Sequence, residues 1–404
     1  MASTPTNTAA ASPETALPGE TNLLVHLTAV SPEAVEPALA NLTLAFPGQS
    51  LPVAVPDIAA NLTSGQTFNT LRLLPYTPSA HSTTPWVLTA ADYLNSFKLA
   101  EEHNANACLL LGAESQSLSP DSIRNLAAAT LSSTSDLSVA NYHLGPREGL
   151  INSAILYPVT RAIFGARPRF PLALDLGISL RLAEGLAAQA QRFTAAGQDD
   201  AILWPVSEAA VAGYAIAEAE VPTRTAPPTA PTDFNALFAL ITGSLFTDID
   251  AKAPFWQRVR NTVPPRAITA VPSPTEPLDV SPMLESFHLA YTNLQEIWAL
   301  VLPPHTLLGL KRLSLMPPEA FRMADNLWAR IVYDFTLAYR LRTINRGHLL
   351  GALTPLYLAW VASHLTLVHG GVPPERHIEE LAVAFETDKP YLVSRWRWPD
   401  RFNP

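Results

Sequence analysis

The chain has 404 residues, of which 48% are hydrophobic and 15% charged, and this composition predicts a globular protein of two domains with a large core. Its 35 acids outnumber its 26 lysines and arginines, giving a formal charge of −9, and it has no basic run, so nucleic acid is excluded as a partner. The single cysteine, Cys108, excludes an internal disulfide and suits a reducing cytoplasm, where we expect the protein to reside.

The chain begins with a segment, 1–20, rich in Ala, Ser, Thr and Pro. It lacks the basic start and the apolar stretch of a secretory signal, and we expect a disordered tail. From 21 to about 230, short β-like runs alternate with helical runs, which predicts a sheet whose strands are joined by crossover helices. The strands are expected at 23–30, 52–55, 72–74, 107–111, 139–144 and 214–221, and the helices from Ser31 and Ser119 and at 89–102, 151–164, 178–192 and 207–213.

The second half of the chain has a different pattern. A Pro/Thr-rich stretch at 222–231 is the expected linker, and beyond it apolar residues recur at helical spacing, as in the stripe from Phe321 to Leu341. The apolar segment 349–368 is interrupted by Pro355, Ser363 and His364, so it is interpreted as a buried core helix and not as a membrane span. Residues 231–404 are therefore predicted to form an all-α domain.

Several chemistries require spacings that this sequence does not contain. It has no Gly-rich phosphate loop followed by Lys-Ser/Thr, no G-x-G-x-x-G and no G-x-S-x-G. His364 and His369 are five positions apart, which places them on different sides of a helix and disfavours a paired metal site.

The most informative segment is 151–179, which reads INSAILYPVTRAIFGARPRFPLALDLGIS. It resembles GT-A glycosyltransferases of the mannosylglycerate synthase and family 2 type, in which Tyr-Pro-Leu-Thr-Arg is followed by Gln-Pro-Leu/Ile-Gly-Gly-Glu/Asp. The similarity extends loosely over 21–230 and continues into 385–404. The resemblance implies a GT-A-like, Rossmann-like α/β domain followed by an all-α C-terminal domain.

The resemblance also implies a nucleotide diphosphate sugar at the carboxyl ends of the strands, beside a divalent metal. The Asp-x-Asp of that family corresponds to Gly112-Ala113-Glu114, so Gly112 and Glu114 are expected to bind the donor, with Glu114 as the remaining metal ligand. A solvated loop acid is the alternative for Glu114. A further histidine ligand of the family would fall at 222–228, which contains none. No cofactor is therefore assigned firmly, and Mg²⁺ or Mn²⁺ is left open.

Two more positions are carried over from the resemblance. The Gly-Gly-Glu/Asp turn corresponds to Ala173-Leu174-Asp175, which makes Asp175 the catalytic candidate beside the acceptor hydroxyl. Its alternative role is to cap the helix expected from Ile178. Trp204 is retained from a further motif and is assigned to donor binding. The Gly-Lys-Gly of the family is replaced by Trp86-Val-Leu-Thr-Ala90.

Four arginines, Arg147, Arg161, Arg167 and Arg169, lie close together in a half of the chain that is otherwise poor in basic residues. They favour an acceptor or a phosphate as ligand, because guanidinium groups pair with carboxylates and phosphates. The alternative is that Arg167 and Arg169 pair with nearby acids on a solvated loop.

Two functions follow from these residues. In the first, the protein transfers a sugar from a nucleotide diphosphate sugar to a small hydroxylated or carboxylated acceptor. In the second, it is a catalytically degenerate homologue that binds a partner or a ligand, or regulates, without turnover. The oligomeric state, including a homo-oligomer, is open.

Overall fold

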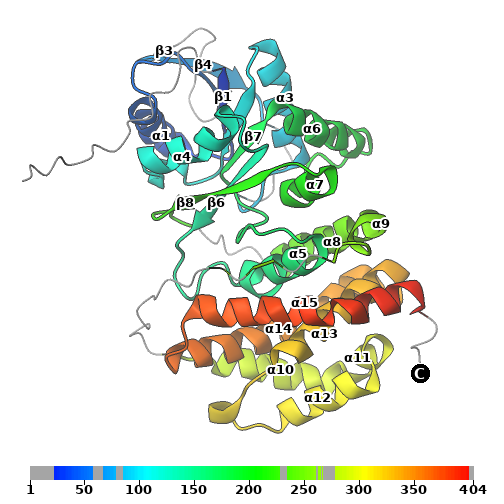
Figure 1. Ribbon diagram of the computed structural model, residues 1–404. Coiled ribbons are helices and arrows are strands. Elements are labelled where there is room, and N and C mark those ends of the chain that lie inside the picture. The colour runs from blue at the N-terminus through cyan, green and yellow to red at the C-terminus, as the bar shows by residue number, and fades with distance from the viewer. Residues whose placement is uncertain are drawn as a thin grey trace, which may run out of the picture.

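The computed structural model describes residues 22–57, 67–78, 85–227, 234–260, 263–264, 266 and 278–399. The expected tail at 1–20 lies outside these residues. The described chain forms two layers, a sheet with its flanking helices and a second layer made of helices (Figure 1). The predicted class, a Rossmann-like α/β fold followed by an all-α region, is confirmed.

The described strands form one mixed sheet in the order β3-β4-β2-β1-β5-β7-β6-β8. β1, β2, β4 and β5 pair in parallel, β6 pairs in parallel with β8, and β7 is antiparallel to both of its neighbours. The strand order reverses between β1 and β5, which makes the carboxyl ends of these two strands the expected ligand crevice. The bounds are β1 Leu23–Leu27, β2 Pro52–Pro56, β3 Thr67–Phe68, β4 Leu71–Tyr76, β5 Ala107–Leu111, β6 Leu137–Tyr142, β7 Leu176–Ser179 and β8 Ile216–Val221.

Helices cover both faces of the sheet. α1 (Pro32–Ala45) and α4 (Pro120–Leu131) lie on one face, and α3 (Ala90–Glu102) and α6 (Leu180–Ala195) lie on the other (Figure 1). Their starts follow the expected capping chemistry, since Thr89 and Asp92 form a capping box and the Ser119 side chain accepts a hydrogen bond from the Ser122 amide.

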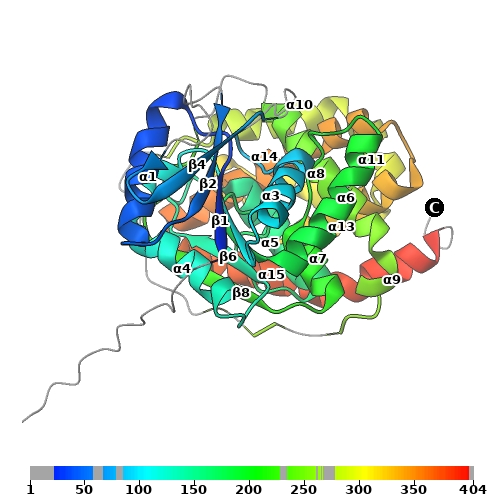
Figure 2. The same ribbon diagram turned by 90° about the horizontal axis from the view of Figure 1, so that it is seen from above.

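The chain leaves the sheet after β6 and enters the helical layer before it returns as β7. A π-helical turn, Asn152–Leu156, leads into α5 (Tyr157–Phe164), and α5 packs against the C-terminal helix α15. Seen from above, α14 and α15 pass beneath the strands (Figure 2). The remaining helices are α7 Pro205–Ala212, α8 Phe234–Ala251, α9 Ala253–Trp256, α10 Ser281–Asn293, α11 Gln295–Val301, α12 Pro304–Ser314, α13 Asp325–Leu341, α14 Arg346–His369 and α15 Pro374–Arg397.

The centre of the helical layer is α14. This helix is long and apolar enough to cross a membrane, but 78% of its apolar window is buried inside the protein, as expected for a core helix. Trp328 and Trp360 are fully buried and their rings stack 6.4 Å apart. The Trp328 indole donates a hydrogen bond to the Ala154 carbonyl at 2.8 Å, which ties the π-helical turn to the helical layer.

Three details differ from the predicted elements. The helix expected from Ile178 begins at Leu180, because 176–179 forms the strand β7. A glycine in that strand hid the pattern, yet it is needed there, since a Cβ on Gly177 would lie 2.5 Å from the Leu126 carbonyl oxygen of α4. The stripe that was predicted from Phe321 to Leu341 is buried along α13 from Trp328 to Ala338, whereas Ala324 precedes the helix and is exposed and Leu341 is 44% exposed.

Candidate functional site

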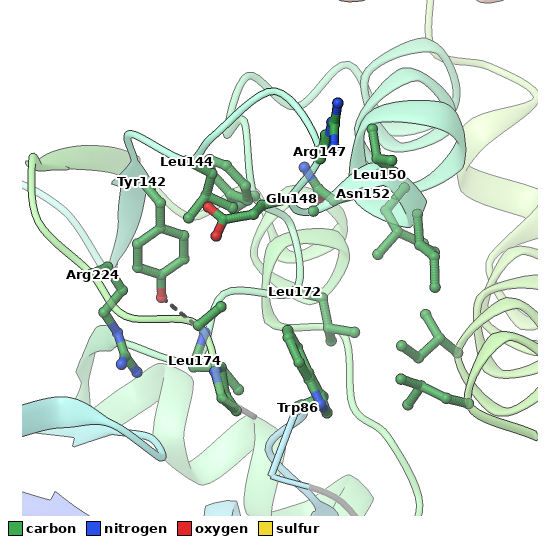
Figure 3. Close-up of a pocket in the computed structure, with 18 of the residues that line it drawn as sticks. Trp86, Tyr142, Leu144, Arg147, Glu148, Leu150, Asn152, Leu172, Leu174 and Arg224 are labelled. Carbon is green, nitrogen blue, oxygen red and sulfur yellow. Dashed lines mark hydrogen bonds between the residues drawn. The ribbon is translucent and has the colours of Figure 1, made fainter. Parts of the chain in front are cut away.

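A cavity of about 560 Å³ lies between the carboxyl edge of the sheet and the helical layer, and we call it the interlayer cavity (Figure 3). The ends of β6 and β8, the loop at 143–152 and the segment before β7 form one side. Side chains of α8 and α14 form the other. The cavity therefore lies at a junction of layers, where ligand sites commonly occur.

The walls of the interlayer cavity are mostly apolar. Aromatic and aliphatic side chains dominate them, and Figure 3 shows several pointing into the space: Trp86, Leu144, Leu150, Leu172 and Leu174. The polar residues of the lining are Tyr142, Arg147, Glu148, Asn152, Arg224, Thr225 and Tyr357. Two guanidinium groups and one carboxylate therefore border a space that is otherwise suited to an apolar molecule.

Asp175 lies behind the residues that line the interlayer cavity, and its carboxylate accepts hydrogen bonds from an amide, a hydroxyl and a guanidinium group. Its carboxylate receives the Gly112 amide at 3.1 Å, the Tyr142 hydroxyl at 2.8 Å and the Arg224 Nε at 2.7 Å. Asp175 has no exposed surface and is not among the residues that line the cavity. The structure thus brings together Gly112 and Asp175, two residues that were assigned to one site, but the carboxylate is already paired.

The alternative role of Asp175 as a helix cap is wrong. The helix α6 begins at Leu180, and its N-cap is Ser179, whose hydroxyl accepts from the Leu182 amide. Asp175 instead precedes β7, and because β7 is antiparallel to its neighbours, this position lies at the carboxyl edge of the parallel strands.

Tyr142 connects Asp175 to the cavity. Its hydroxyl donates to Asp175 and accepts from the amides of Leu174 and Asp175, both at 3.1 Å. Burial and the neighbouring Asp175 hold the pKa of Tyr142 well above its ordinary value, so the phenol stays protonated and remains a donor.

Arg224 is the main residue that the sequence analysis missed. It follows β8 within the predicted linker, its side chain is 4% exposed, and its Nη2 donates to the Ala113 carbonyl at 2.5 Å. Burial favours the neutral form, but Asp175 and Tyr142 outweigh it and raise the pKa of Arg224, so the group stays charged. A lone arginine directly after the last strand of a sheet was the signal that could have identified it.

Glu114 lies beside this cluster in a left-handed conformation, with φ of 62°, and accepts from the Gln116 side chain at 2.7 Å. Within the described part of the chain, no three His, Cys, Asp or Glu side chains gather as they would around a metal ion. Asp175 is paired with Arg224, which leaves Glu114 without a second carboxylate partner for a cation. The donor set therefore does not fit Mg²⁺ or Mn²⁺.

Trp204 does not join the other predicted donor residues. It is 3% exposed, its indole donates to the Ser244 hydroxyl at 3.0 Å, and it lines a different cavity beside α7 and α8.

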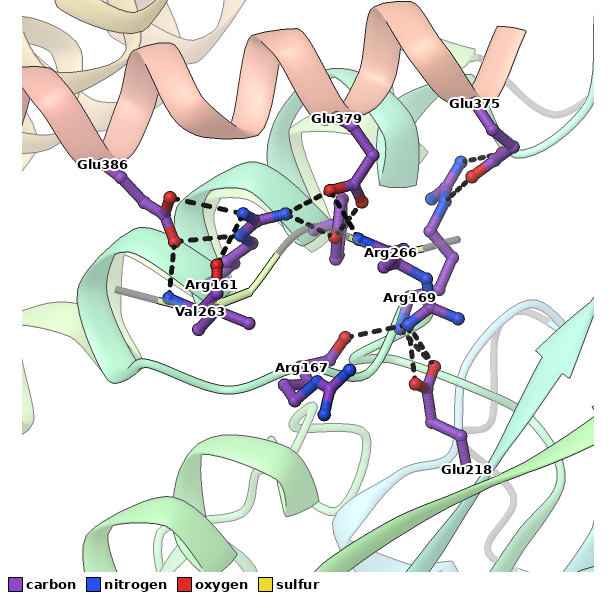
Figure 4. Close-up of polar contacts among 10 residues, drawn as sticks. Arg161, Arg167, Arg169, Glu218, Val263, Arg266, Glu375, Glu379 and Glu386 are labelled. Carbon is purple, nitrogen blue, oxygen red and sulfur yellow. Dashed lines mark hydrogen bonds and ion pairs between the residues drawn. The ribbon is translucent and has the colours of Figure 1, made fainter. Parts of the chain in front are cut away.

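The four arginines divide into two groups, and Figure 4 shows three of them, Arg161, Arg167 and Arg169. Arg161 is 1% exposed and pairs with Glu379 at 2.5 Å and with Glu386 at 2.9 Å, both on α15. Arg169 pairs with Glu375 of the same helix at 3.0 Å. Arg169 therefore pairs with an acid of α15 in a buried interface, and not with nearby acids on a solvated loop as the alternative had it.

The other two arginines are exposed. Arg167 accepts a hydrogen bond from Arg266 through its backbone carbonyl at 3.1 Å, and its own guanidinium lies at the surface. Arg147 lines the interlayer cavity. Of the four arginines, Arg147 alone is placed beside that cavity.

Comparisons with known proteins show only a distant structural likeness. No family profile matches the sequence, and no curated protein matches it. Among solved structures, glucosyl-3-phosphoglycerate synthase from Mycobacterium tuberculosis, crystallised with phosphoglyceric acid, matches over 58% of this chain and 85% of its own, with 16% identity and a TM-score of 0.34. A likeness this distant assigns neither an activity nor a substrate to the chain.

Proposed function

We propose that the interlayer cavity binds a small molecule with an apolar body and a carboxylate, and that this molecule accepts a sugar from a nucleotide diphosphate sugar. The observation that carries the proposal is the position of the cavity, at the carboxyl edge of a Rossmann-like sheet with Arg224 and Arg147 in its lining. Ligands of open α/β sheets bind at this edge, and guanidinium groups favour carboxylates.

The walls define the acceptor. Burial of apolar ligand surface against Trp86, Leu144 and Leu172 supplies affinity at about 25 cal/mol per Å². The two arginines supply orientation, because a buried carboxylate needs a charged partner. The acceptor is therefore a carboxylic acid with an aliphatic or aromatic body.

In the reaction, the bond between the anomeric carbon and the diphosphate breaks while a bond to an acceptor oxygen forms. A hydroxyl acceptor must also lose a proton, and Glu148 is the carboxylate among the lining residues. Glu148 now accepts from the Gly145 amide at 2.8 Å. Asp175 acts in this proposal by positioning Tyr142 and Arg224 from behind the wall.

The second candidate is binding without turnover. The surroundings of Asp175 favour binding without turnover. This acid was expected to act on the acceptor, but it is buried and its carboxylate is paired with Arg224. The same ligand would occupy the same cavity in this case, but no sugar would be transferred.

Two measurements test the proposal. Thermal unfolding with a panel of aliphatic and aromatic carboxylic acids should reveal a ligand, which at 100 times its dissociation constant stabilises by about 2.7 kcal/mol. Leu237→Trp fills the cavity from α8 and should abolish the shift, whereas Ala236→Trp on the exposed side of the same helix should leave it unchanged. A shift that survives Leu237→Trp refutes the site.

Release of nucleoside diphosphate then separates the two candidates. A panel of nucleotide sugars is incubated with the protein and a carboxylic acid that it binds. Release of nucleoside diphosphate that requires both the nucleotide sugar and the acid supports transfer. Ligand binding without release supports the second candidate. Chelation by EDTA should change donor affinity by less than tenfold, because Glu114 has no carboxylate partner for a cation.

A further inference from the structure

A second cavity, of about 700 Å³, lies on the opposite side of α8, and we call it the lateral cavity. α6, α7, α8 and the loop at 198–203 surround it. The helices α8 and α14 contribute residues to both cavities, but none of the residues that line the lateral cavity lines the interlayer cavity.

One wall of the lateral cavity holds a charged triad. The Lys252 ammonium pairs with Glu208 and with Asp248, and the three side chains are 9%, 17% and 12% exposed. The Ser207 hydroxyl donates to Asp248 at 2.7 Å and accepts from Lys252 at 3.0 Å. Burial raises the pKa of Asp248 although Lys252 and Ser207 oppose this shift. Removing three charged groups from water is costly, so their position in a cavity points to a use beyond packing.

The triad restricts the charge of a ligand. Lys252 already occupies the place between the two carboxylates, so a second cation would be repelled by it. The lining as a whole has three acids, Asp200, Glu208 and Asp248, against Arg192 and Lys252, so an anion is disfavoured as well. A neutral ligand is the one that fits both conditions.

The rest of the lining is mostly apolar, and a smaller number of polar residues supply hydrogen bonds beside aromatic ring faces. Gln189 and Gln198 each offer donors and acceptors, and the carboxylates offer acceptors alone. Phe193 and Tyr339 provide aromatic surface. A ligand that matches this lining has hydroxyl groups on one side, which donate and accept, and a C–H face on the other side that lies against the rings and aliphatic side chains.

We infer that the lateral cavity is a binding site for a neutral saccharide or polyol. The site is separate from the proposed acceptor site and does not depend on it. Trp204, which the sequence assigned to donor binding, forms part of this site, where its indole is held by Ser244.

The test is saturation-transfer NMR and calorimetry on the full chain with neutral mono- and disaccharides. Glucose, glucosamine and glucuronic acid form a matched set that differs in charge on one ring. Binding is expected for neutral sugars with a dissociation constant of about 1 mM, near −4 kcal/mol, and at least fivefold weaker for the charged analogues. No binding of any neutral sugar at about 20 mM, or tighter binding of a charged analogue, overturns the inference.

Variants locate the binding. Phe193→Ala and Gln198→Ala alter side chains that are partly or largely exposed, so the fold should persist, and each should weaken neutral sugar binding by about tenfold. Gln191→Ala, on the exposed surface of the same helix and outside the lining, is the matched control and should bind normally. Leu237→Trp, which fills the interlayer cavity, should also bind normally. Sugar binding that is lost in Leu237→Trp but kept in Phe193→Ala refutes the assignment.

Discussion

Two arginines of this protein face carboxylates in opposite settings. Arg224 pairs with Asp175 at the sheet edge, and its side chain lines a cavity. Arg161 pairs with Glu379 and Glu386 between α5 and α15, where its side chain is enclosed by protein (Figure 4). Both are ion pairs between an arginine and a carboxylate. Only the pair at the sheet edge lies beside a cavity, and this makes it a candidate ligand site, whereas the pair between α5 and α15 is a structural contact.

The comparison also shows what a cluster of arginines in a sequence can mean. Arg161 and Arg169 lie near each other along the chain, which favoured an anionic ligand. Their partners are instead three glutamates of α15, more than 200 positions later in the chain. The carboxylates that neutralise a cluster can thus come from anywhere in the chain, and only the fold reveals them.

The largest expected effect is on the enclosed pair. Arg161→Met should destabilise the fold by about 3–5 kcal/mol, because Glu379 and Glu386 would remain buried without a cation. Urea unfolding monitored by circular dichroism measures the change. Arg167→Ala is the matched control nearby in the chain, and its exposed side chain should cost less than about 0.5 kcal/mol. Equal losses in the two variants would contradict the distinction between them.

At the sheet edge, Asp175→Asn keeps the shape of the side chain but removes the charge that faces Arg224. We expect a loss of about 3 kcal/mol in unfolding free energy, because Arg224 would stay buried and unpaired. Glu114→Gln, partly exposed at the same edge, should cost less than about 0.5 kcal/mol. A stable Asp175→Asn protein that has lost only turnover would restore Asp175 to the catalytic role that the sequence assigned to it.

Each layer also contains a buried histidine. Burial lowers the pKa of His26, in β1, and of His364, in α14, to about 3. At these two sites the unfolded chain therefore binds protons that the folded chain does not, so the two histidines cost no stability well above pH 6.5 and destabilise the fold increasingly as the pH drops toward 3. Each histidine should cost about 2 kcal/mol at pH 5. The unfolding free energy is measured between pH 8 and pH 5. The part of its change that the two histidines cause should be about half as large in His364→Asn as in the unmodified protein.

The smallest expected change in stability is at Arg147. Its exposed side chain should make Arg147→Ala cost less than about 0.5 kcal/mol of unfolding free energy. The affinity of a carboxylic acid for the interlayer cavity should nevertheless fall by about tenfold, because a charged hydrogen bond is lost. Calorimetry measures this affinity in Arg147→Ala and in Arg167→Ala, which changes an arginine away from the cavity. Equal affinities in the two variants would remove Arg147 from the site.

The sequence predicted the sheet well and the site only in part. β5 is a continuous apolar run and β1 is apolar except for His26, which is the pattern of a central buried strand, and both strands were predicted to start at the residues where they start. β7 was missed because Gly177 interrupts its apolar pattern. Asp175 and Gly112 were assigned to one site and are hydrogen-bonded, while their catalytic and donor-binding roles stay predictions. The partner that neutralises Asp175, Arg224, is 49 positions away in the chain, and no local pattern reports such a contact.

The helix α5 belongs to the first half of the chain but packs against the C-terminal helix α15, and this has a consequence during synthesis of the protein. Glu379 follows Arg161 by 218 positions, so a ribosome adding about 5–20 residues per second needs about 10–40 s between the two. During that interval Arg161 and the neighbouring face of α5 have no α15 to cover them. Newly made chains that stop before residue 374 would expose this face, and they are the species on which we expect chaperones and proteases to act.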